Sequence, residues 1–324
     1  MFNAKFKSLL CSGEKVTEEQ LQTERNILSM ERSIDQLSRR KFVGGLSGAA
    51  ALAVGAGFLP SSAFAQTAAT PSIADVLNFA LNLEYLEAGL YYFVTTGQLI
   101  PTSYTGTPTG TISLPPTALY TAVQGNAGAA ALAAALVQDE LDHIMDLRST
   151  ITALGGKPIS APAINYAAKG TVTTVAQFLA TARQFTAVGN SAYAGAAQFL
   201  VSNTGVLTVA AQILGAEGQH LGAVNFACIQ ENVTTAFNTY TGTPSPYLDE
   251  QDTPPSPSLY FTVAVPNNVA GIPAGLPPAR TPAEILGIAY GISTPTTVTP
   301  PTGTKSGGFF PSGVNGSNAA LETT

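Results

Sequence analysis

The chain contains only two histidines, and each follows a glutamate by three positions, in Glu140-x-x-His143 and Glu217-x-x-His220. Residues three positions apart lie side by side on one face of an α-helix. Both pairs occur within long stretches rich in Ala and other apolar residues. We therefore expect two helices that each place a carboxylate and an imidazole together on an inward face.

Four long helical segments are expected, at residues 72–96, 116–154, 172–202 and 206–236. The first starts at Ser72 with Asp75 three residues later, which is typical of a capping box. The second ends at Gly155-Gly156, a C-cap signal, and we expect a break or kink in it at Asn126-Ala127-Gly128. Small residues on every face let such helices approach closely. The predicted fold class is therefore all-α, an antiparallel four-helix bundle.

Two segments differ in composition from these helices. The polar Thr/Gly/Pro stretch at 97–116 is long for a bundle loop, so we expect an excursion such as a small hairpin or an Ω-loop. From 241 to 324, Pro, Thr, Ser and Gly dominate, with one helical stretch at 281–290. This region is expected to be an extended tail that wraps the surface, the alternative being a low-complexity linker. The predicted organisation is a leader at 1–65, a bundle at 66–240 and a tail at 241–324.

The leader has the features of an export signal. A twin-arginine pair, Arg39-Arg40, precedes an apolar, glycine-containing run at 43–59 and the small-x-small pattern Ala63-Phe64-Ala65. This order predicts export by the twin-arginine route to the periplasm or beyond, with no stable transmembrane span after processing. An uncleaved N-terminal anchor is the alternative. The net charge of −6 argues against a nucleic-acid partner, which would require clustered basic residues.

Carboxylates interrupt the apolar stripes of three predicted helices. On the first helix the inward stripe contains Glu84 and Glu87, while Glu140 with His143 and Glu217 with His220 lie on the stripes of the second and fourth. Asp139, Asp142 and Asp146 fall on another face, expected to be solvated. Burying a carboxylate costs several kcal/mol unless it is paired or bound to metal, and no Lys or Arg lies on these stripes. Metal coordination explains the pattern best, and two unrelated core histidines are the alternative.

This pattern resembles the ferritin-like di-metal carboxylate proteins. More closely, the chain resembles exported bacterial ferritin-like domain proteins related to desiccation-associated proteins. The sequence motifs that carry the resemblance are Leu83-Glu84-Tyr85-Leu86-Glu87-Ala88, Asp139-Glu140-Leu141-Asp142-His143, Ala192-Tyr193 and Gly307-Gly308-Phe309-Phe310-Pro311.

The resemblance implies an Fe or Mn site that oxidises Fe(II) with oxygen or peroxide. It implies Glu140 and Glu217 as bridging or terminal ligands, and His143 and His220 as ligands of one metal ion each. Carboxylate and imidazole ligands suit these metals. The tyrosines Tyr85, Tyr91, Tyr92 and Tyr193 are candidates for radical or supporting roles, with ordinary core packing as the alternative.

The chain departs from the family pattern in its third helix, since residues 172–202 contain no Asp or Glu. By the resemblance, the missing carboxylate falls near Thr186. Either Glu87 acts as a substitute ligand in an asymmetric dinuclear site, or the site holds one ion or none. An alternative for Glu87 is a supporting or surface carboxylate.

Three functions follow, in this order. The first is an exported metal-binding protein with weak ferroxidase or peroxide-detoxifying activity. The second is a structural or stress-protection protein with a vestigial site, and the third is a manganese-catalase-like enzyme. The sequence leaves open the metal, the number of ions, the substrate, homo-oligomer formation and the role of the tail.

Overall fold

The structure is a computed structural model that describes residues 71–168, 170–233, 279–291 and 303–316. These residues all lie within one compact unit, Gln66–Thr324, and the predicted leader at 1–65 lies outside them. The helices are α5 (Ile73–Thr96), α6 (Thr102–Thr105), α7 (Thr117–Gln124), α8 (Ala127–Ala153), α9 (Val175–Leu200), α10 (Thr204–Gln230) and α12 (Pro282–Ala289). The strands are β1 (Ile112–Ser113) and β2 (Ile164–Asn165).

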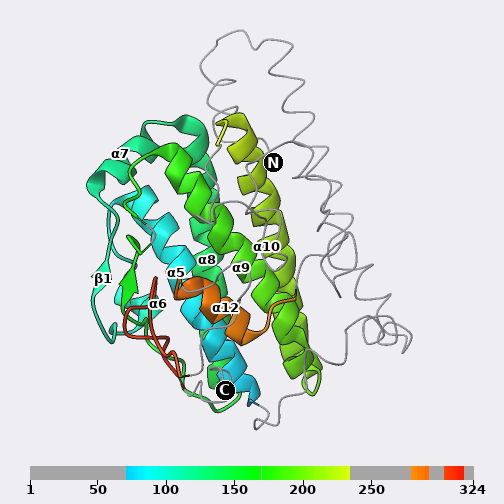
Figure 1. Cartoon of the computed structure of the whole chain (residues 1–324). Coiled ribbons are helices and arrows are strands. Elements are labelled where there is room, and N and C mark those ends of the chain that lie inside the picture. Colours follow the sequence, from blue (N-terminus) through cyan, green and yellow to red (C-terminus); the bar gives the residue numbers. More distant parts are fainter. Residues whose placement is uncertain (1–70, 169, 234–278, 292–302, 317–324) are drawn as a thin grey trace, which may run out of the picture. The chain divides into compact units, whose positions relative to one another are not determined.

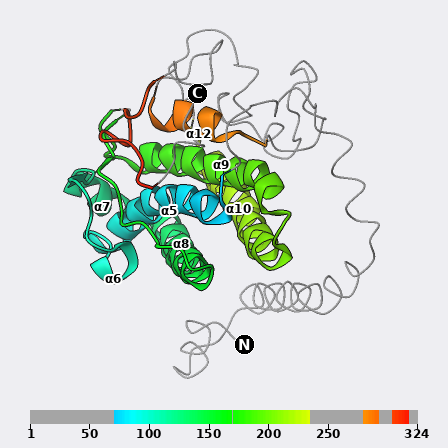
Figure 2. The ribbon, with the colours of Figure 1, turned by 90° about the horizontal axis from the view of Figure 1, so that it is seen from below.

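The four long helices α5, α8, α9 and α10 pack side by side, which confirms the predicted fold class (Figures 1 and 2). Helix α5 contacts α8 and α9, and α10 contacts α9 and α8. Helices α5 and α8 run in opposite directions, as do α9 and α10 (Figure 1). The two pairs are joined by the long connection at 154–174, which contains β2. The helices are therefore not all joined by short turns.

Local sequence signals set the helix ends. The capping box of Ser72 and Asp75 is present at the start of α5. The break expected near residue 126 separates α7 from α8, where the Asn126 side chain accepts a hydrogen bond of 2.9 Å from the Ala129 N–H. A side chain that caps the first free N–H groups stabilises a new helix start. The predicted segment 116–154 is thus two consecutive helices.

The stretch at 97–116 is not a hairpin. It contains α6 and β1, and β1 pairs in parallel with β2, with Ile112 opposite Ile164 and Ser113 opposite Asn165. A hairpin would require both strands within the stretch. Instead, the backbone of 109–113 hydrogen-bonds to that of 161–166, for example from the Thr109 N–H to the Ala161 carbonyl at 2.9 Å. The excursion therefore anchors the connection between the two helix pairs.

The described part of the tail packs on the bundle. Helix α12 lies against α9 (Figure 2), and its own residues Ile285 and Leu286 are buried. The Phe309 ring meets the Phe185 ring edge to face, with ring centroids 5.0 Å apart. At Gly195 of α9 the backbone carbonyl of Arg280 approaches so closely that a Cβ atom there would lie 1.9 Å from it. The helix predicted at 281–290 is confirmed, and residues 241–278, 292–302 and 317–324 lie outside the described residues.

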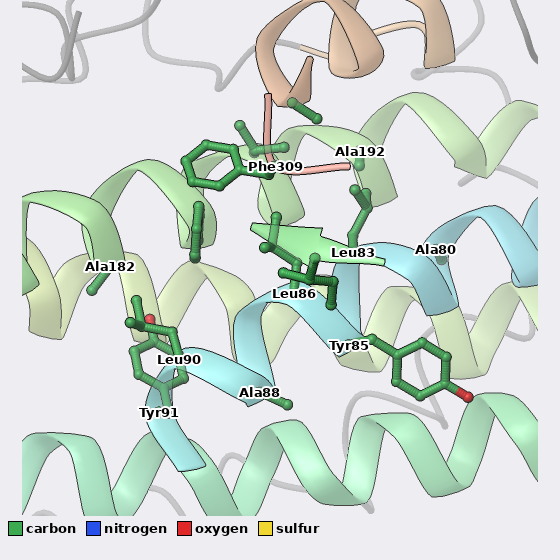
Figure 3. Packing of buried hydrophobic residues seen from close by; sticks show 14 of the residues in the cluster. Ala80, Leu83, Tyr85, Leu86, Ala88, Leu90, Tyr91, Ala182, Ala192 and Phe309 are labelled. Atoms are coloured by element: carbon green, nitrogen blue, oxygen red, sulfur yellow. The ribbon is translucent and has the colours of Figure 1, made fainter. Parts of the chain in front are cut away.

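Helix α5 is the central element of the bundle. Nearly every residue from Val76 to Val94 is buried, because α7, α8, α9 and the tail surround it. Figure 3 shows Leu83 and Leu86 of α5 below Phe309 of the tail. Glu84 and Glu87, in the middle of this helix, are therefore buried, with 3% and 4% of their surface exposed. Within the described ranges, no helix combines the length and hydropathy needed to span a bilayer.

Candidate metal site

All six residues predicted as ligands are buried inside the bundle. They come from three helices, and the most exposed of them, His143, is only 7% accessible. The residues are Glu84 and Glu87 on α5, Glu140 and His143 on α8, and Glu217 and His220 on α10. The expected inward orientation of these helix faces is confirmed.

Four of the six converge on one point. Ligand atoms of Glu84, Glu140, His143 and Glu217 all lie within 4.8 Å of one another. The imidazole Nδ1 of His143 lies 3.3 Å from Glu140 Oε2, 3.5 Å from Glu84 Oε2 and 3.6 Å from Glu217 Oε1. One nitrogen thus faces three carboxylates, an arrangement that a shared cation would stabilise.

His220 lies beside this group and links it to the surface. Its Nδ1 is 3.0 Å from Glu140 Oε1, and its Nε2 is 3.0 Å from Asp139 Oδ2. The rings of His143 and His220 stack with centroids 5.8 Å apart. Asp139 is exposed, as expected, but its contact with His220 was not predicted from the sequence. Since that contact crosses from α8 to α10, no spacing within either helix could reveal it.

Glu87 of α5, the remaining predicted ligand, is held by two hydroxyl groups. Its Oε1 accepts hydrogen bonds from Thr186 Oγ1 at 2.6 Å and from the Tyr91 hydroxyl at 3.0 Å. Thr186 is fully buried on α9, and the resemblance stated above implied a carboxylate near this position. The third helix therefore contributes a hydroxyl donor to a carboxylate of α5 in place of a carboxylate of its own.

The four candidate tyrosines divide into two kinds. Tyr193 donates a 2.5 Å hydrogen bond to Glu84 Oε1, and Tyr91 bonds to Glu87. Tyr85 instead donates to the backbone carbonyl of Ile159 and accepts from Arg148, while Tyr92 packs at the edge of the hydrophobic core. Only Tyr91 and Tyr193 touch carboxylates of the site.

Gly189 provides room for two of the carboxylates. A Cβ atom at this position of α9 would lie 3.0 Å from Glu217 Oε2 and 3.4 Å from Glu87 Oε2. A glycine inside a helix costs roughly 0.5–1 kcal/mol relative to alanine, so its presence indicates a close approach. That signal is in the sequence, but it does not say which groups approach.

The charges of the cluster perturb one another strongly. Burial raises the pKa of Glu84 to about 7 and the pKa values of Glu87 and Glu217 well above the usual value, and the charge of Glu140 adds to each. Burial also favours a raised pKa at Glu140, but hydrogen bonds with His143 and His220 lower that pKa to about 2. Burial opposes the charged form of His143, yet Glu84 and Glu140 raise its pKa to about 11.

The donor set fits a hard divalent cation. Among the described residues, Glu84 Oε2 and Glu217 Oε2 are buried without a hydrogen-bond partner, while Glu140 Oε1 and His220 Nδ1 form an ion pair at 3.0 Å. A buried oxygen without a partner costs about 1–3 kcal/mol, and a metal ion would satisfy both of these carboxylate oxygens at once. Carboxylate oxygens with imidazole nitrogens suit Fe or Mn better than soft-ligand metals.

Residues 72–230 match the family model of the ferritin-like domain. The match includes all four long helices and the six residues of the cluster. This part of the chain is therefore a ferritin-like domain with a buried Glu/His group that could hold a metal ion. A search of curated protein sequences finds no match to the chain.

Proposed function

We propose that this chain is an exported ferritin-like protein that binds Fe or Mn in the bundle, with weak ferroxidase or peroxide-detoxifying activity. The observation that carries the proposal is the convergence of Glu84, Glu140, His143 and Glu217, whose buried oxygens include two without hydrogen-bond partners. In this proposal Glu87 and His220, which are not among these four residues, are the ligands available to a second ion.

Bound iron would supply one electron per Fe(II) to an oxidant, either dioxygen or peroxide. The residues of the chain hold the ligands in place for this. Tyr193 fixes one oxygen of Glu84, which leaves Oε2 facing His143. Thr186 and Tyr91 fix one oxygen of Glu87. Partners that orient metal ligands typically change metal affinity or activity by about 10- to 100-fold when they are removed.

The expectation of weak turnover rests on the third helix. The resemblance implies a carboxylate on α9 near Thr186, and α9 offers a hydroxyl group there instead. The ligands available to two ions would therefore be unequal. Its fourth carboxylate, Glu87, comes from the same helix as Glu84 and is already engaged by two hydroxyl donors. We therefore propose metal binding as the principal property and oxidation as the slower one.

The proposal of export does not depend on the metal site. The twin-arginine pattern at 39–40 and the resemblance to exported ferritin-like proteins support it. Replacing both arginines, Arg39→Lys and Arg40→Lys, is expected to keep the protein in the cytoplasm, as measured by cell fractionation with an antibody to the chain. An unchanged distribution would remove this part of the proposal and leave the metal site untouched.

The test of the metal site is the metal content of the folded protein after anaerobic addition of Fe(II) or Mn(II). We expect bound metal in the unaltered protein and its loss in the double variant His143→Ala/His220→Ala. The matched control is Asp142→Asn, which removes an exposed carboxylate of α8 whose hydrogen bond is to Gln138. Equal metal content in all three proteins, or none in any, would favour the structural, stress-protection function.

Activity assays distinguish the proposed slow Fe(II) oxidation from the manganese-catalase-like alternative. Slow Fe(II) oxidation, followed by the absorbance of Fe(III), is expected from the metal-loaded protein. Rapid oxygen evolution from hydrogen peroxide by the Mn-loaded protein would instead identify a manganese-catalase-like enzyme. The same double variant serves as the blank in both assays.

A further inference from the structure

The last described segment of the tail is tied to the central helix of the bundle at Asn315. This segment, the strap, comprises residues 303–316 (red in Figure 1). The backbone N–H of Asn315 donates to Asn82 Oδ1 at 2.9 Å, and its backbone carbonyl accepts from Asn82 Nδ2 at 3.0 Å. Asn82 is fully buried on α5, so the backbone at Asn315 has a fixed place on that helix.

The side-chain amide of Asn315 ties the strap to two further segments. Its Nδ2 donates to Thr109 Oγ1 at 2.8 Å and to the Ser160 carbonyl at 2.9 Å. Thr109 belongs to the stretch 97–116 and Ser160 to the connection 154–174, the two segments that pair through β1 and β2. A hydroxyl group can also donate to a carboxylate, but the Ser160 carbonyl is an acceptor only. This junction therefore fits asparagine and does not fit aspartate.

Gly316 follows Asn315, and this pair of residues is chemically labile. The backbone nitrogen of a glycine can attack the side-chain Cγ of a preceding asparagine, because glycine has no side chain that hinders the approach. The new N–Cγ bond expels ammonia and forms a cyclic succinimide, which one water molecule opens to aspartate or isoaspartate. The reaction needs no oxidant, cofactor or enzyme. Asn315-Gly316 is the only Asn-Gly pair in the sequence, and Gly316 is exposed.

Docking of the strap protects Asn315 from this reaction. The side-chain Cγ must move to the nitrogen of Gly316, while the hydrogen bonds of Nδ2 to Thr109 and Ser160 hold the amide in place. The reaction therefore requires a local opening of the strap. In the product, a carboxylate oxygen replaces the donor and would meet the Ser160 carbonyl oxygen. Because two acceptors cannot form a hydrogen bond, the product docks less stably than asparagine.

We propose that Asn315-Gly316 is a deamidation site that releases the end of the strap irreversibly. A docked strap keeps Asn315 intact, and a strap that opens exposes it to the reaction. Since the product cannot rebuild the junction, the released form accumulates with the time that the strap spends open. This proposal goes beyond the proposed function and does not depend on metal binding.

The first test compares the rate of deamidation in the folded full chain and in a synthetic peptide of residues 311–320. Mass spectrometry and an isoaspartate methyltransferase assay follow the conversion at mildly alkaline pH. We expect Asn315 to convert at least about 10-fold more slowly in the folded chain, because the strap must open first. Thr109→Val removes one acceptor of the amide and should speed the conversion several-fold. The control is Thr121→Val on α7, whose hydroxyl donates to the Thr117 carbonyl.

The second test uses Asn315→Asp, which carries the product from the start. Hydrogen exchange of the amide at position 315 should be about 10-fold faster than in the unaltered protein. The Phe309 amide donates to the Ala289 carbonyl and should keep its protection. Asn203→Asp is the matched control, since its side-chain oxygen caps α10 as an acceptor and a carboxylate can do the same. This control should leave the strap unchanged.

Four results would overturn the proposal. The first is conversion in the folded chain as fast as in the peptide, and the second is equal conversion in the Thr109→Val and Thr121→Val proteins. The third is an absence of conversion in folded Thr109→Val protein over the time in which the peptide converts completely. The fourth is an Asn315→Asp protein whose strap is as well protected as that of the Asn203→Asp control.

Discussion

At the scale of single residues, the crowded carboxylates make stability depend on pH. The folded-state pKa of Glu84 is about 7, and those of Glu87 and Glu217 are well above the usual value because of burial. Such groups stabilise the folded state fully below their unfolded pKa, near 4.3, and lose that contribution as pH rises through the folded pKa. His143 acts in the same direction, between its unfolded pKa near 6.5 and about 11. Glu140, with its pKa near 2, acts in the opposite direction only at acid pH.

The metal-free protein should therefore become less stable as pH rises from about 5 to about 8. Metal binding displaces protons from these ligands, so the increase in Tm on adding Fe(II) or Mn(II) should grow over the same range. Differential scanning calorimetry with and without metal checks both statements. The variant Glu217→Gln should flatten the pH dependence of the metal-free protein. A metal-free Tm that rises with pH over this range would contradict the charge assignment.

Thr186 lies near the position where the resemblance implies a carboxylate, and its hydroxyl donates a hydrogen bond to Glu87. Thr186→Val keeps the shape but removes the donor to Glu87 Oε1. We expect metal affinity to fall by about 10- to 100-fold, as when other partners of metal ligands are removed. The control is Thr181→Val on the same helix, whose hydroxyl donates to the Gln177 carbonyl and not to the site. Isothermal titration calorimetry with Mn(II) measures the affinity. Equal affinities of the two variants would mean that the hydrogen bond from Thr186 to Glu87 does not contribute to metal binding.

At the scale of elements, the sequence predicted what local signals determine. The starts of α5 and α8 follow from the capping side chains of Ser72 and Asn126, and the site faces follow from three-residue spacing. The pairing of β1 with β2 could not be predicted, because two-residue strands carry no period and their partners are remote. The docking of the tail could not be predicted either, because the residues that meet there are remote in the sequence. The buried Asn82 exchanges hydrogen bonds with the backbone of Asn315, at 3.0 and 2.9 Å, across more than 200 residues.

The contact of α9 with the start of α12 gives a prediction for the tail. Gly195→Ala would place a methyl group against the Arg280 carbonyl, which is backbone and cannot turn aside. We expect a loss of about 1–3 kcal/mol in the free energy of unfolding, as for other overpacked positions, and faster proteolysis of the tail.

The control for this prediction is Gly215→Ala on the exposed face of α10, where no atom lies within 4 Å of the added group. This change should leave stability unchanged or raise it by roughly 0.5–1 kcal/mol, since alanine favours helix. Urea unfolding and timed digestion, followed by mass spectrometry, measure both variants. A Gly195→Ala protein as stable and as resistant as the control would show that α12 does not depend on this close approach.

At the scale of the whole molecule, the site is where three helices bring their polar residues together. The six candidate ligands could be named from sequence because each interrupts an apolar stripe on its own helix. Tyr193 was named from the sequence as a candidate for a supporting role, but the contacts of Asp139, Thr186 and Tyr193 could not be predicted, since each reaches a carboxylate or imidazole of another helix. Their roles appear only when the packing of α5, α8, α9 and α10 is known.

The most direct test of the account is a crystal structure of the iron-soaked protein with anomalous data collected on both sides of the iron absorption edge. We predict an iron peak bound by Glu84, Glu140, His143 and Glu217. A second peak bound by Glu87 or by His220 would make the site dinuclear, and a single peak would make it mononuclear. An anomalous map without iron at the Glu84–Glu140–His143–Glu217 group, from protein soaked at neutral pH, would contradict the central claim.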